Sequence, residues 1–209
     1  IQSVRFADMR LVGYVNQVDD KAEEQFSGVT FLIGDGSAFV AFRGTDDAMV
    51  GWKEDFNMSF EMQVPAQRDA VTYVEKASAA LQCPLRVGGH SKGGNLAAYA
   101  GMFVSDETRE YIQTVYNFDG PGFNEATISS PDFGKVDMRV RTFVPQCSMV
   151  GILMWHREPF TIVRSDGVGV FQHDAYTWQI MGGSFLTLRE RTGHSHFADN
   201  TIKHWLEEM

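Results

Sequence analysis

The sequence feature that most constrains the fold is a glycine-rich turn between a short apolar run and an alanine-rich stretch. Residues 89–94 read GHSKGG; we predict a buried strand before them, at 85–88, and a helix at 93–104. This is a G-x-S-x-G pattern in a strand–turn–helix setting. The turn strains the Ser91 backbone, and side chains two residues to either side would collide with the neighbouring strand and helix. The alternative is a glycine-rich helix start with an N-capping serine.

Hydrophobic periodicity predicts an α/β protein around this turn. Apolar runs at 29–34 and 37–42 flank Asp35-Gly36, a pair typical of a hairpin. A hairpin followed by alternating helices and short strands predicts one α/β domain over residues 1–209, with a mostly parallel sheet, an N-terminal antiparallel hairpin and helices on both faces. The further predicted helices are 3–18 (one helix or two short ones), 48–56, 66–81 and 195–208, and the further strands are 114–118, 138–144, 160–164 and an extra one at 185–188.

Composition excludes several classes of function. The 209 residues are 44% hydrophobic and 22% charged, which is ordinary for a globular protein. Against 27 acidic residues there are 18 Lys and Arg, and the net charge of −9 disfavours binding to nucleic acid or to anionic lipid. The longest nearly unbroken apolar run, 147–155, is shorter than the roughly 20 residues that cross a bilayer. Two cysteines, Cys83 and Cys147, predict neither a disulfide scaffold nor structural zinc.

The chain begins at Ile1 rather than at a methionine, and no basic-then-apolar signal segment precedes it. We therefore expect a chain that is trimmed at one or both ends and that resides in the cytoplasm. Nothing in the sequence predicts its oligomeric state.

Ser91 would need a general base, and that base an acidic partner that orients it. In α/β proteins with this elbow, the order along the chain is serine, acid, histidine. Asp119 directly follows the strand predicted at 114–118, in a loop of glycines and proline that would hold its carboxylate still. The end of the next strand, at 145–148, has no carboxylate. We predict Asp119 as the acid; the alternative is a residue that forms an Asx turn or caps a helix.

Histidine is the side chain best suited to proton transfer near neutral pH. His173 follows the last clearly predicted strand and is the predicted base. His194 and His196 come later and remain alternatives, whereas His156 lies at the wrong end of that strand. His90 should point away from the Ser91 hydroxyl. For each of these histidines, a purely structural role is the alternative. His194-x-His196 has no third ligand spaced to complete a metal site, so we expect no metal. We also expect no cofactor.

Acyl transfer also requires N–H donors aimed at the oxygen that gains negative charge. One donor would be the backbone N–H of Lys92, the residue after the nucleophile. The other should come from a loop after an earlier strand, and the Gly44-Thr45 turn after the strand at 37–42 is the good candidate. The backbone N–H of Thr45, with its hydroxyl, is the predicted second donor.

These motifs resemble those of the class 3 lipases. Residues 42–45 (FRGT), followed by Trp52-x-x-Asp55, are similar to the oxyanion-loop signature of that family, and residues 89–93 match its elbow. The chain is more similar still to a bacterial lipase-like family of unknown function that shares residues 118–123 (FDGPGF) and 172–174 (QHD). The resemblance covers about residues 31–178. It implies an α/β-hydrolase fold with Ser91 as nucleophile, Thr45 and Lys92 as oxyanion donors and His173 as base.

One position departs from the class 3 pattern. Those lipases place their acid after the later strand, where this chain has Ser148. An acid at Asp119 is instead similar to the arrangement in pancreatic-type lipases. The departure leaves open a weakened or non-catalytic site.

The apolar run at 148–155 lies just past a predicted strand end, near the presumed site. It could line an acyl pocket, with Met149, Ile152 and Leu153 contacting substrate, or form a mobile lid; methionine suits surfaces that adapt to varied apolar ligands. The alternative is an ordinary buried helix.

The sequence thus favours a serine hydrolase that cleaves a carboxylic ester, with a small acyl-ester or lipid-like substrate. A module that kept the fold for binding or regulation but lost turnover is the main alternative. Amide cleavage or acyl transfer by the same residues is the third.

Overall fold

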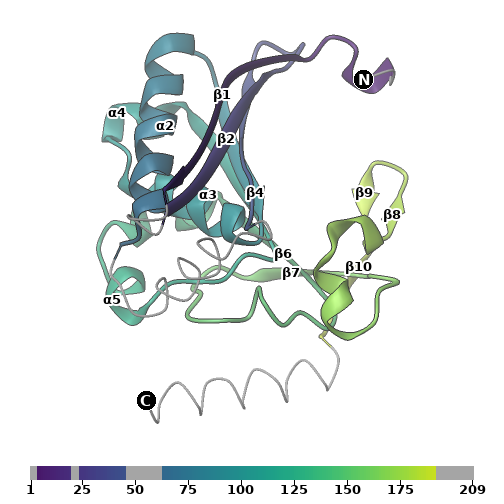
Figure 1. Ribbon diagram of the computed structural model, residues 1–209. Coiled ribbons are helices and arrows are strands. Elements are labelled where there is room, and N and C mark those ends of the chain that lie inside the picture. Colours follow the sequence, from purple (N-terminus) through teal and green to yellow (C-terminus); the bar gives the residue numbers. More distant parts are fainter. Residues whose placement is uncertain (1–3, 20–23, 46–62, 192–209) are drawn as a thin grey trace.

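The computed structural model describes residues 4–19, 24–45 and 63–191. Their main feature is a mixed sheet in the order β1-β2-β3-β4-β5-β6-β7-β10 (Figure 1). The strands β3 to β7 pair in parallel, whereas β1, β2 and β10 are antiparallel to their neighbours. Their bounds are β1 Arg10–Asp19, β2 Glu24–Leu32, β3 Ala38–Phe42, β4 Leu85–His90, β5 Ile112–Phe118, β6 Val140–Pro145, β7 Phe160–Val163 and β10 Thr187–Leu188.

A separate small hairpin consists of β8 (Ile180–Met181) and β9 (Ser184–Phe185). The helices of the described residues are α2 Pro65–Leu81, α3 Lys92–Phe103, α4 Asp106–Tyr111 and α5 Glu125–Ile128, with 3₁₀ turns at η1 Val4–Phe6, η2 Phe133–Lys135, η3 Asp137–Arg139, η4 Gly169–His173 and η5 Ala175–Thr177. None of these helices combines the length and apolar character that a membrane crossing requires.

The hairpin, the parallel strands and the helices at 66–81 and 93–104 are confirmed, as is the α/β fold class. The hairpin turns at Asp35-Gly36, where Gly36 has a φ of +82° that suits glycine. The extra strand predicted at 185–188 is divided between β9 and β10. The predicted helices at 48–56 and 195–208 lie outside the described residues.

The prediction of helix for residues 3–18 is wrong. Within residues 4–18, only η1 is helical, and β1 forms an edge strand paired with β2. A register shift between Val12 and Val15 surrounds Gly13, whose φ is +64°. Such a bulge breaks the strict alternation of a strand, so that the apolar residues recur at intervals that resemble a helix.

The core lies between the sheet and the helices α2 and α3, which pack against each other on one side of it (Figure 1). Val40, Val87 and Val115 from three adjacent strands are fully buried there. The small residues of α3 allow close packing, so that the helix is buried along most of its length. The opposite face carries half-buried aromatic side chains in mutual ring contact, including Tyr116 and Phe118.

Candidate active site

Ser91 occupies a sharp turn between β4 and α3. Its φ of 58° and ψ of −132° are strained values for a residue with a side chain. A Cβ atom on Gly89 would lie 2.6 Å from the Phe42 carbonyl oxygen, and one on Gly93 would lie 2.9 Å from the Phe42 carbonyl carbon, so both positions need glycine. The side chain of Ser91 makes no capping hydrogen bond to α3. The elbow geometry is therefore present, and the alternative of an N-capping serine is wrong.

The predicted oxyanion loop lies against this elbow. A Cβ atom on Gly44 would be 2.8 Å from the His90 carbonyl oxygen and 3.1 Å from Ser91 Cβ, so the Gly44-Thr45 turn passes beside the serine. Lys92 begins α3, where backbone N–H groups have no partner within the helix. Lys92 is only 1% exposed, and its side-chain Nζ donates a hydrogen bond to the Gln25 carbonyl oxygen at 2.9 Å.

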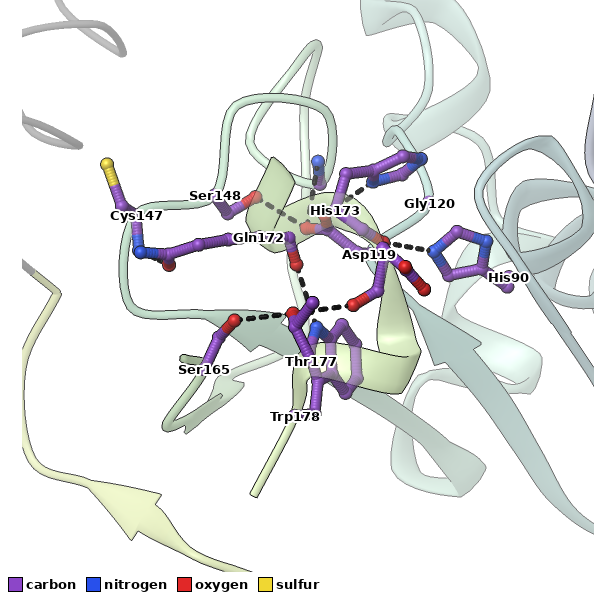
Figure 2. A network of polar contacts seen from close by, with 12 residues as sticks. His90, Asp119, Gly120, Cys147, Ser148, Ser165, Gln172, His173, Thr177 and Trp178 are labelled. Atoms are coloured by element: carbon purple, nitrogen blue, oxygen red, sulfur yellow. Dashed lines mark hydrogen bonds and ion pairs between the residues drawn. The ribbon is translucent and has the colours of Figure 1, made fainter. Parts of the chain in front are cut away.

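Asp119 directly follows β5 and is completely buried. Its Oδ1 accepts a hydrogen bond from the Ser148 hydroxyl at 2.5 Å (Figure 2). The same oxygen accepts from the Gly151 N–H at 3.2 Å. The Asx-turn alternative applies to Asn117 instead, whose Oδ1 accepts from the Gly120 N–H at 2.8 Å. The side chain of Asp119 therefore does not form the Asx turn, and its second carboxylate oxygen, Oδ2, faces a histidine.

That histidine is His173, in η4. Its Nδ1 lies 2.7 Å from Asp119 Oδ2 (Figure 2). Because an ionised carboxylate only accepts, Nδ1 carries the hydrogen, which leaves Nε2 of the neutral ring as a proton acceptor. The side chain of His173 is 27% exposed, so the ring remains accessible. The hydrogen bonds between described residues include none from the Ser91 hydroxyl to His173 Nε2; catalytic bonds of this kind often tighten only with substrate bound.

The rival histidines differ in their placement. His156 has a different partner, with its Nδ1 3.0 Å from Oε1 of Glu158, and both side chains are buried. His194 and His196 lie outside the described residues. Within the described ranges, no group of three or more His, Cys, Asp or Glu side chains is arranged to hold a metal ion.

Sequence reasoning missed the role of His90. Its Nε2 lies 2.6 Å from the carbonyl oxygen of His173, and the two rings lie 4.5 Å apart. Burial lowers the pKa of His90, and the nearby His173 lowers it further. The prediction that this ring points away from the Ser91 hydroxyl gave no sign that it contacts His173, the predicted base. The only sequence signal for His90 was its position directly before Ser91, the predicted nucleophile.

A second missed residue is Gln172, which fastens the segment of His173 to the end of β6. Gln172 is buried; its Oε1 accepts from the Cys147 N–H at 2.9 Å and its Nε2 donates to the Gly167 carbonyl oxygen at 3.0 Å. Trp178 Nε1 donates to the Gln172 carbonyl oxygen at 2.8 Å (Figure 2). The sequence signal available for Gln172 was its position directly before the predicted base, His173.

The run at 148–155 is neither a helix nor a strand but an irregular loop, so the alternative of a buried helix is wrong. The loop supports Asp119 through Ser148 and Gly151. Met149 is 38% exposed, Leu153 is half-buried and Ile152 is 5% exposed.

The model of the Mbeg1-like family matches residues 1–209, the entire chain. The chain belongs to the Mbeg1-like family. No curated protein sequence matches it.

Solved structures similar to this Mbeg1-like chain include several lipases. The Rhizomucor miehei lipase propeptide complex has a TM-score of 0.56 at 13% identity, over 93% of this chain and 65% of that one. A triacylglycerol lipase from Penicillium expansum has a TM-score of 0.53 at 14% identity, over 76% and 71%. A fungal lipase–inhibitor complex has a TM-score of 0.52 at 15% identity, over 75% and 67%.

The M37 lipase is also similar, and the chain spans only 55% of its length. Identities this low establish the fold alone. The chain therefore has a lipase-like α/β-hydrolase fold, with the predicted Ser91, Asp119 and His173 at the carboxyl ends of the strands or in the loops beyond them.

Proposed function

We propose that the chain is a serine hydrolase that cleaves carboxylic esters, with Ser91 as nucleophile, His173 as general base and Asp119 as the acid that orients it. The observation that carries the proposal is the 2.7 Å hydrogen bond between His173 Nδ1 and the buried carboxylate of Asp119, next to the strained turn of Ser91. A carboxylate–histidine pair beside an elbow serine is the arrangement that acyl transfer requires.

In the proposed reaction, Ser91 Oγ attacks the ester carbonyl carbon while His173 Nε2 takes the hydroxyl proton. The resulting oxyanion accepts hydrogen bonds from the backbone N–H groups of Thr45 and Lys92. Collapse of the tetrahedral intermediate breaks the bond to the alcohol, which leaves with the proton from His173. Water then attacks the acyl-serine with His173 again as base, and the acid is released.

The proposed substrate is an ester with an apolar, lipid-like acyl chain. The solved structures with this fold include proteins named as lipases and a triacylglycerol lipase. Large apolar side chains are exposed on both sides of His173, with Phe171 at 75% and Tyr176 at 98%. Among the predicted contacts, Met149 and Leu153 would touch the acyl chain directly, and the buried Ile152 would pack behind them.

A series of p-nitrophenyl esters from acetate to decanoate tests this proposal, with Ser91→Ala as the matched control. We expect hydrolysis that depends on Ser91 and increases toward the longer chains. Fastest cleavage of acetate with none of decanoate would refute the lipid-like substrate while leaving the hydrolase intact. No Ser91-dependent cleavage of any ester by the folded protein would refute the hydrolase and favour a binding module.

A further inference from the structure

His90 connects the elbow to the segment that carries the predicted base. It is the last residue of β4, directly before Ser91, and its side chain reaches the backbone of a residue 83 positions later. A carbonyl oxygen only accepts, so the 2.6 Å contact with His173 requires a hydrogen on Nε2 of His90. The side chain of His90, the residue before Ser91, therefore hydrogen-bonds to the main chain of His173.

The lowered pKa of His90 favours the neutral form of the ring, which still carries the Nε2 hydrogen that this bond requires. Burial is the main cause of its lowered pKa, and the ring of His173 adds to it. The groups that act on His90 from neighbouring segments are His173, Asp119 and Asp174. A neutral ring adds no positive charge beside His173, which would have to become positively charged itself during acyl transfer.

His173 needs such an anchor because of the element it belongs to. The 3₁₀ turn η4 has weaker backbone hydrogen bonds than an α-helix, and the side chains of Phe171 and Tyr176 around it are largely exposed. Gln172 fastens this segment to the end of β6. His90 fastens it to the end of β4, the strand that leads into Ser91.

We propose that His90 is a positioning residue. Its Nε2–H bond to the His173 carbonyl oxygen holds His173, the proposed base, in position relative to Ser91. This inference rests on the proposed function, since it assigns His173 as the base. The Asp119 bond fixes the orientation of the ring, and the His90 bond fixes the main chain from which the ring projects.

Two variants of His90 separate the hydrogen bond from the packing of the ring. His90→Gln keeps a donor, because the amide nitrogen of glutamine is as many bonds from Cα as Nε2 of histidine. His90→Phe keeps an aromatic ring against His173 but donates nothing. The measurement is the second-order rate of fluorophosphonate labelling of Ser91 as a function of pH, with the melting temperature of each variant as the control for folding.

We expect labelling of His90→Phe to be about 10- to 100-fold slower than wild type, because a small misplacement of a catalytic group costs about this much. His90→Gln should recover most of that loss.

Equal labelling of His90→Phe and wild type would overturn the inference. So would an equal deficit in His90→Gln and His90→Phe when both variants melt like wild type. If the wild type itself shows no Ser91-dependent labelling, the proposed function fails instead, and the two failures are thereby distinguished.

Discussion

Replacing Asp119 by asparagine isolates the charge of its carboxylate with little other change. The residue has a φ of 50°, a left-handed value that asparagine adopts more readily than most residues, so the backbone is not strained further. The Oδ1 atom of asparagine can still accept from Ser148 and Gly151. Only the atom that faces His173 changes, from an oxygen that accepts to an NH₂ group that donates.

The effect on catalysis should be large and the effect on stability small. An amide donor opposite Nδ1 selects the tautomer of His173 with its hydrogen on Nε2, which cannot accept a proton from Ser91. In a serine protease triad, the same change lowers kcat about 10⁴-fold, which corresponds to about 5 kcal/mol of transition-state free energy. The free energy of unfolding should fall by only about 1 to 3 kcal/mol, the typical value of a hydrogen bond to a charged group.

The assay is the rate of Ser91 labelling by a fluorophosphonate, with urea unfolding of the same samples. Ser148→Ala is the matched control, because it removes one donor to Asp119 while the bond to His173 remains. We expect the control to lose far less activity than Asp119→Asn, because the bond between Asp119 and His173, which selects the tautomer, remains. Wild-type labelling by a folded Asp119→Asn variant would refute the role of Asp119 as the acid.

Three further predictions concern the framework around the site. Gly93→Ala places a Cβ against the Phe42 backbone and should destabilise the fold by at least about 2 kcal/mol, measured by urea unfolding; a smaller loss would contradict the close approach. Burial alone would raise the pKa of Glu158, but hydrogen bonds from His156 and Thr142 lower it below 4.5, so its ionised form stabilises the fold above that pH. The stability advantage of wild type over Glu158→Gln, followed by thermal unfolding, should therefore shrink as the pH falls below 4.5, and a constant difference would refute this. Gln82→Gly relieves a φ of 46° at the end of α2 and should stabilise by about 0.5 kcal/mol, seen as a higher melting temperature; a lower one would argue against the strain.

The elbow could be predicted from the sequence because its physical requirement leaves a mark in the residue types. Gly89 and Gly93 are needed where strand, turn and helix come too close for a Cβ atom, and nothing but glycine meets that need. The strands of the sheet were predictable for a similar reason, since buried parallel strands appear as short apolar runs. Asp119 was predicted as the acid because it follows such a run directly.

The residues that were missed depend on contacts across long stretches of chain. The side chain of His90 meets a carbonyl 83 residues later, and the side chain of Gln172 meets the Cys147 N–H 25 residues earlier. Such contacts follow from how distant loops return to the sheet edge, which local periodicity does not encode. The error in β1 has a local cause, the bulge at Gly13, which disturbs the period on which the prediction depends.

The most direct test of the account is fluorophosphonate labelling of the wild type, Ser91→Ala and His173→Ala, followed by intact mass. We expect a single adduct on the wild type that is absent from both variants. An adduct retained by Ser91→Ala would contradict the assignment of the nucleophile, and one retained by His173→Ala would contradict that of the base. A folded wild type without any adduct would contradict the central claim, that this elbow holds an activated serine.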